Sequence, residues 1–161
     1  VTGTRRLVGT ITAFTVAHSI TLVAATLGVV RVSPQPVEAV IALSIVFVAG
    51  EIVHAREGRS GWAQRWPWLV AFTFGLLHGF GFAGALREVG LPEHAIPLAL
   101  LFFNVGVEVG QLLFIAALLA LAVAGRRLWP ARPAWAWRVP AYAMGGIAAF
   151  WTIERTVAFW R

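Results

Sequence analysis

The chain has 161 residues, of which 59% are hydrophobic and only 12% are charged, and its formal net charge is +6. A water-soluble domain usually has about 25% charged residues, so this composition excludes an ordinary soluble domain and indicates an integral membrane protein. The chain contains no cysteine, which excludes disulfides, thiolate metal sites and thiol catalysis. Its arginines mostly flank apolar segments, so the positive charge indicates orientation in a membrane rather than binding to nucleic acid.

Long apolar segments follow one another along the chain and predict a single all-α domain, a polytopic transmembrane helix bundle with about five spans. An α-helix needs about 20 apolar residues to cross a bilayer, and each segment comes near that length. The charged segment 55–65 and the basic, Pro- and Trp-rich segment 126–138 are predicted to be linkers. The predicted spans cover residues 7–28, 37–54, 66–86, 95–124 and 139–160.

The arginines are unevenly divided between the two predicted membrane faces, nine on one and four on the other. Because cytoplasmic loops are enriched in arginine, the amino end and both linkers are predicted to be cytoplasmic and the carboxyl end outside. The expected location is the bacterial inner membrane, with lipid around the helices. The nine are Arg5, Arg6, Arg56, Arg59, Arg65, Arg126, Arg127, Arg132 and Arg138, and the four are Arg31, Arg87, Arg155 and Arg161.

Two pairs of predicted spans share a residue pattern. This pattern predicts two related helical hairpins of the same orientation, followed by a fifth helix. The matching strings are Phe14-x-x-x-His18 with Phe74-x-x-x-His78, and Glu51-x-x-His54 with Glu108-x-x-Gln111.

Several ionisable side chains fall inside the predicted spans, where each costs about 2.5–3.5 kcal/mol on insertion scales and therefore needs a role. His18 and His78 lie near mid-membrane, and Glu108 is similarly deep. Imidazole and carboxylate groups together suit a divalent transition metal. The predicted metal ligands are His18, Glu51, His78 and Glu108, with Thr15, Asn104 and Gln111 as supporting hydrogen-bonding groups and His54, an interfacial residue, as a further ligand candidate.

Glycines spaced four apart accompany these polar residues. Gly75 and Gly79 stand beside His78, and Gly106 and Gly110 stand around Glu108. Small residues at this spacing let helices approach closely in lipid, so both pairs are predicted to support convergence of the helices.

Three strings together resemble the HupE/UreJ-type membrane proteins, a family associated with hydrogenase and urease accessory systems and regarded as nickel or cobalt permeases. Proteins of this type usually have an earlier helix with an H-x-x-x-G-x-D-H string, whereas this chain contains no Asp. We therefore expect either that the chain is the C-terminal part of a longer protein or that its site lacks those ligands. The strings begin at Phe14, Phe74 and Phe103, cover about residues 14–111, and imply functional roles for His18, Glu51, His78, Asn104, Glu108 and Gln111.

The favoured function is transmembrane transport of a divalent transition metal through an intramembrane His/Glu site. The resemblance favours nickel, and cobalt, zinc, iron, manganese and copper are alternatives. No nucleotide-binding motif is present, so the expected driving force is an ion gradient, the membrane potential or a cytosolic metal-trapping partner. Two other functions stay open: an intramembrane metalloenzyme, because Glu-x-x-His pairs hold metal centres in helical bundles, and a non-catalytic accessory subunit whose polar residues only join helices.

Overall fold

The computed structural model describes residues 3–88, 93–128, 133 and 135–160, and every regular element in these ranges is helical. This confirms the predicted all-α fold. The long helices are α1 (Thr4–Thr26), α2 (Pro34–Arg56), α4 (Pro67–Glu88), α5 (Ile96–Leu128) and α6 (Arg138–Val157), and the short ones are α3 (Trp62–Arg65), η1 (Glu93–Ala95) and η2 (Ala158–Trp160).

Each of the five predicted spans forms a long helix. By length and hydropathy, α1, α2, α4 and α5 are able to cross a membrane. The α6 helix is not among them, since it is less apolar and carries Glu154 and Arg155 near its end. Whether α6 also crosses the bilayer stays a prediction. Arg132 and Arg161, two members of the arginine count, lie outside the described residues.

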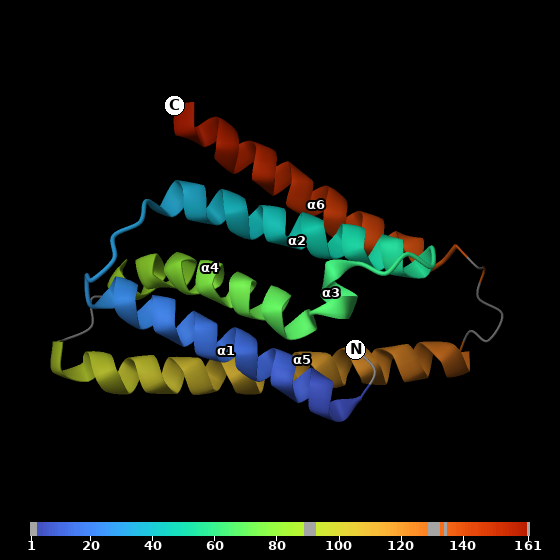
Figure 1. Ribbon diagram of the computed structural model, residues 1–161, viewed down its shortest axis with the longest axis horizontal. Helices are drawn as coiled ribbons and strands as arrows, with labels where there is room; N and C mark the ends of the chain where they lie inside the picture. Colours follow the sequence, from blue (N-terminus) through green and yellow to red (C-terminus); the bar gives the residue numbers. More distant parts are fainter. Residues whose placement is uncertain (1–2, 89–92, 129–132, 134, 161) are drawn as a thin grey trace.

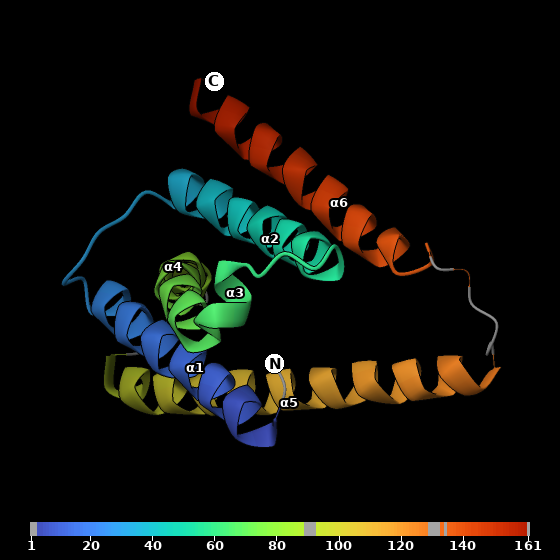
Figure 2. The same cartoon turned by 45° about the vertical axis from the view of Figure 1, so that its right-hand side comes forward.

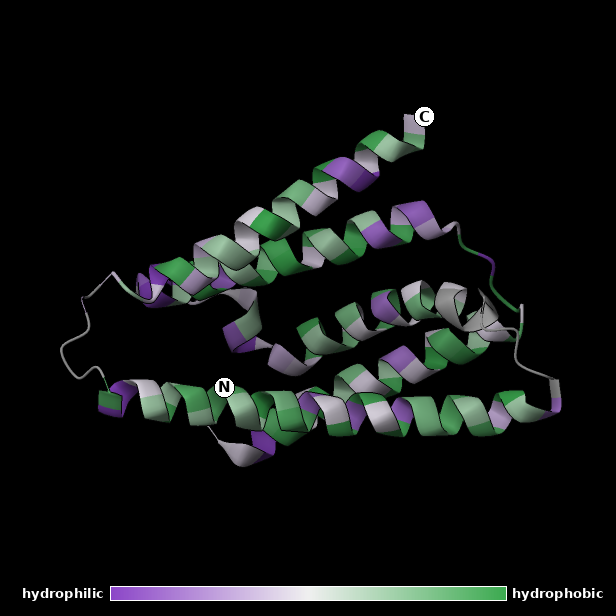
Figure 3. Cartoon of the chain, turned by 180° about the vertical axis from the view of Figure 1, so that it is seen from behind, coloured by the Kyte–Doolittle hydropathy of each residue, from purple (hydrophilic) through white to green (hydrophobic). Residues whose placement is uncertain are grey.

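The long helices lie in a row in the order α5, α1, α4, α2, α6 (Figures 1 and 2). The pair formed by α1 and α4 is the most extensively packed and stands at the centre, while α5 and α6 each contact one long neighbour. Apolar residues predominate along these helices (Figure 3), and large side chains on α5 and α6 are exposed, as expected for surfaces that face lipid.

Two glycines of α4 bring its backbone against α1. A Cβ at Gly75 would collide with the carbonyl oxygen of Phe14, and a Cβ at Gly79 would collide with that of His18. Gly79 follows Gly75 along α4 and His18 follows Phe14 along α1, so the two helices run in the same direction. This close, parallel pairing is the role predicted for the first G-x-x-x-G pair.

The second glycine pair behaves differently. A Cβ at Gly106 or Gly110 would meet no atom within 4 Å among the described residues. These two glycines therefore do not bring α5 close to another described helix.

The helix contacts have the internal symmetry that the matching strings predict. In the repeat, α1 corresponds to α4 and α2 corresponds to α5. The contact between α2 and α4 is therefore the counterpart of the contact between α5 and α1. Both outer contacts are antiparallel. Along α1, Thr15 meets Gln111 and His18 meets Asn104, so α5 runs the opposite way. Along α4, Phe74 meets Phe47 and Gly81 lies against Ile41, so α2 also runs the opposite way. The helices related by the repeat thus occupy equivalent places, with α6 added against α2. Among the described residues, however, α1 does not pack on α2, nor α4 on α5, so the two helix pairs interlock through α1 and α4 instead of forming two packed hairpins.

Small residues and charges hold α6 against α2. A Cβ at Gly145 would lie 3.1 Å from the Cβ of Ala49, so the helices are in close contact at their middles. Near one end, Nε of Arg155 lies 3.1 Å from a carboxylate oxygen of Glu38. Near the other, the guanidinium of Arg56 lies 5.9 Å from the ring centroid of Trp137. The helix is therefore anchored at three levels.

The predicted linker 55–65 contains one unforeseen element, the four-residue helix α3. Its N-cap residue, Gly61, has no side chain with which to bond the first amides of the helix. Instead, the amide of Ala63 donates a hydrogen bond of 2.8 Å to Oε2 of Glu51. A carboxylate twelve residues earlier thus supplies the cap.

Candidate metal centre

His18 is the most enclosed ionisable side chain among the described residues, with 1% of its surface exposed. Three phenylalanine rings surround it. The rings of Phe14 and Phe103 stack with the imidazole at centroid distances of 6.0 and 6.1 Å, and Phe82 meets it edge-on at 5.6 Å. These rings come from α1, α5 and α4, so the imidazole stands where three helices meet.

Asn104 of α5 orients this imidazole. Nδ1 of His18 lies 3.2 Å from Oδ1 of Asn104, while Nδ2 of Asn104 donates a 2.8 Å hydrogen bond to the carbonyl oxygen of Leu100. Turning the amide over would place two acceptors against each other, so Asn104 presents its oxygen and His18 donates from Nδ1. The neutral ring then has its lone pair on Nε2.

The Nε2 atom of His18 is buried and has no hydrogen-bond partner among the described residues. A buried polar atom without a partner costs free energy and is rare in native structures. An unprotonated imidazole nitrogen is the form that binds a metal. The orphaned atom is therefore what a metal-ligating histidine would show in the absence of its ion.

His78 of α4 has the same tautomer. Its Nδ1 atom lies 2.8 Å from the carbonyl oxygen of Phe74, and a carbonyl oxygen can only accept. Its ring is partly buried, and its centroid lies 5.5 Å from that of Phe14, the ring that also stacks on His18. The two histidines thus flank one phenylalanine, and each offers Nε2 as an acceptor.

Three more predicted residues lie on α1 and α5, the two helices that His18 and Asn104 join. Thr15, one turn before it, has its hydroxyl 3.5 Å from Oε1 of Gln111 on α5. Glu108 is on α5 as well, one turn after Asn104, and it is partly buried. Asn104 and Gln111 therefore link α5 to α1, and Glu108 stands between them along the helix.

The other two predicted residues lie elsewhere. Glu51 caps α3, and His54 is exposed near the end of α2. In the part of the chain that the structure describes, no three His and Glu side chains are grouped closely enough to hold an ion. The structure thus brings together His18, His78 and Asn104, whereas a site using all four predicted ligands stays a prediction.

Sequence analysis did not assign a role to the rings around His18. Each of the three belongs to a string that carries the family resemblance: Phe14 lies four residues before His18, Phe82 four after His78, and Phe103 next to Asn104. Their positions in these strings were the available signal. In the folded chain they form an apolar enclosure around the imidazole.

A comparison with protein-family models matches residues 1–155 to the model described as HupE / UreJ protein. The chain belongs to the HupE / UreJ family. No curated protein and no solved structure gave a match. The matched region covers all five long helices except the last residues of α6. It is therefore much longer than the region of the resembling strings, residues 14–111.

The HupE / UreJ family is linked to nickel uptake, and its match agrees with the apolar helices in describing an integral membrane protein. His18 and His78 lie on α1 and α4, the two helices with the most extensive packing. Membership in this family therefore implies nickel handling for this chain.

Proposed function

We propose that this protein transports a divalent transition metal, nickel above all, across the bacterial inner membrane through a site between α1, α4 and α5. His18 and His78 are its imidazole ligands. Asn104 orients His18, and Glu108 supplies negative charge from α5. The observation that carries the proposal is the buried, unpartnered Nε2 of His18, whose tautomer Asn104 fixes.

The donor set suits a cargo ion that must also leave. Neutral imidazoles bind nickel, cobalt, zinc and copper, and two of them give affinity without the closed shell of a structural site. A carboxylate in low dielectric offsets part of the charge of a dication. Transport requires binding that is strong enough for entry and weak enough for release.

The row of helices also suggests how the site is reached. His18 is enclosed, whereas His78 lines a cavity of about 420 Å³ beside α2. An ion would therefore meet His78 from the cavity and His18 beyond it. We place the cavity on the cytoplasmic side from the arginine distribution, and a cytosolic partner that traps nickel would give the flow a direction.

The test is uptake of radioactive nickel by vesicles that contain the purified full-length protein, with and without His18→Gln or His78→Gln. Each substitution replaces an imidazole by a weaker amide donor of similar reach, and uptake should fall at least about tenfold, the lower range for loss of a group that supports a metal site. Exposed His54 provides the matched control, and His54→Gln should leave uptake close to the original. Full uptake by both folded variants of His18 and His78 would refute the site.

A further inference from the structure

The cavity that His78 lines extends toward α3. At one end its walls include Ala63 of α3 and Pro67 of α4, and at the other they include His78. Ser44 of α2 also lines it, and Phe74 adds an aromatic wall. The cavity therefore extends from one of the two site histidines toward the end of α2 from which α3 follows.

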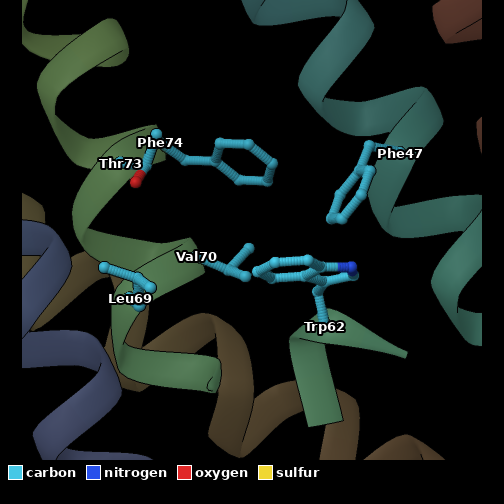
Figure 4. A pocket seen from close by; sticks show the side chains of 6 residues that line it. All are labelled: Phe47, Trp62, Leu69, Val70, Thr73 and Phe74. Atoms are coloured by element: carbon cyan, nitrogen blue, oxygen red, sulfur yellow. The ribbon is translucent and has the colours of Figure 1, made fainter. Parts of the chain in front are cut away.

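A second hollow lies beside this cavity (Figure 4). Trp62 of α3 and Phe47 of α2 stand across from α4 there, and Val70 and Phe74 line both hollows. The four-residue α3 thus contributes Trp62 to one hollow and Ala63 to the next. It lies over this end of the gap between α2 and α4.

One hydrogen bond ties α3 to α2. The carboxylate of Glu51 accepts from the amide of Ala63, as described above, and it lies directly against Gly61. A Cβ on Gly61 would collide with all three terminal atoms of the Glu51 side chain. Because those atoms are the end of a flexible chain, an alanine here would displace the carboxylate without disturbing the helices.

We propose that α3 is a gate over this cavity and that Glu51 is the latch that holds it shut. The cavity walls are almost entirely apolar, with only a few polar groups such as Ser44 and His78. An apolar passage of this kind stays dry and blocks a hydrated ion, which is how hydrophobic constrictions close channels. Release of Ala63 from Glu51 lets α3 move away, admits water and opens the route to His78. The inference deepens the proposed transport and rests on it only for the identity of the cargo.

The test of the gate uses thiol labelling, which needs no metal. Because the chain has no cysteine, Ser44→Cys in the full-length protein gives a single reporter inside the cavity. A small water-soluble thiol reagent should label it slowly while the latch is intact. Adding Glu51→Ala or Gly61→Ala should speed labelling about tenfold, as expected for loss of one charge-assisted hydrogen bond.

Two controls separate the latch from a general effect of charge or folding. Glu51→Gln retains an oxygen that accepts from Ala63, so labelling should stay slow. Glu57→Ala removes an exposed carboxylate in the same linker and should also leave labelling slow. A cysteine at exposed Ser60 should react quickly in every variant. If Ser44→Cys does not fold, Val48→Cys, which also lies on the cavity wall, takes its place as the reporter. The gate is overturned if the cavity cysteine reacts quickly while the latch is intact. It is also overturned if the cysteine still reacts slowly in both Glu51→Ala and Gly61→Ala.

A second measurement tests whether ions use the gated route. Cysteines at Val48 and Ala63, which line the same cavity from α2 and α3, are joined by a reducible bifunctional thiol reagent. Nickel uptake should stop after linking and return on reduction. Uptake that continues through the linked protein would show that the cavity is not the route, even if labelling confirms the gate. Absence of uptake before linking would instead count against the proposed transport itself.

Discussion

Nδ1 of His18 in α1 lies 3.2 Å from Oδ1 of Asn104 in α5, and this contact joins two helices across 86 residues of sequence. Among the described residues, His78 of α4 has no equivalent hydrogen bond to α2. By the matching strings, the position on α2 that corresponds to Asn104 is Phe47, and Phe47 packs edge-on against Phe74 instead of bonding His78. The two histidines are therefore related by the repeat but held differently, one by a side-chain amide and the other by its own backbone.

Replacing Asn104 should weaken the site without removing any ligand. In Asn104→Leu the imidazole loses the acceptor that fixes its tautomer, and such supporting groups are worth about 10- to 100-fold in metal affinity. Nickel affinity of the purified protein, measured by calorimetry, should fall within that range. Val105→Leu, at the adjacent exposed position, is the control and should bind normally. Unchanged affinity in Asn104→Leu would mean that the amide has only a packing role.

The proposed transport also depends on the charge of Glu108. Glu108→Gln keeps the shape and hydrogen-bonding capacity of the side chain but removes the charge that a dication needs. If Glu108 served only to join helices, the amide would replace it, because amides also bond across helices in lipid. We expect nickel uptake to be lost while expression and folding persist. Uptake that continues in the folded variant would assign Glu108 to packing.

The parts of the site that follow chain periodicity could be predicted from sequence. His18 and His78 recur at equal depth in matching spans, and Gly75 and Gly79 repeat at the spacing of a close helix contact, so one-dimensional patterns carry this information. The family strings contain the same residues. The central pairing of α1 with α4 is the spatial counterpart of that repetition.

The role of Glu51 could not be obtained in this way. By pattern it matches Glu108, which made it a ligand candidate, yet its carboxylate bonds an amide of α3. That contact depends on how the linker folds back after α2, and a short helix in a charged linker has no periodicity to reveal it. The open surface around Gly106 and Gly110 is a similar case, because small residues permit close packing without specifying a partner.

Close packing of α4 on α1 provides a stability test. A methyl group in Gly79→Ala would collide with the carbonyl oxygen of His18 and the hydroxyl of Thr21, both held within α1. Because backbone cannot yield as a side chain can, overpacking here should cost about 1–3 kcal/mol and lower the unfolding temperature of the purified protein. Gly110→Ala meets nothing within 4 Å and should be neutral or slightly stabilising. Equal unfolding temperatures for the two variants would contradict the packing of Gly79.

The orientation in the membrane can be tested at the two ends of α2. Ser33 precedes this helix and Ser60 follows it, and both are exposed. The arginine distribution places Ser60, between Arg59 and Arg65, in the cytoplasm, and a spanning α2 then places Ser33 outside. In intact cells, an impermeant thiol reagent should label Ser33→Cys and leave Ser60→Cys unlabelled, whereas both should react after the membrane is permeabilised. The reverse pattern would invert the topology and move the gated cavity to the outer face. Labelling of both cysteines in intact cells would show that α2 does not cross the bilayer at all.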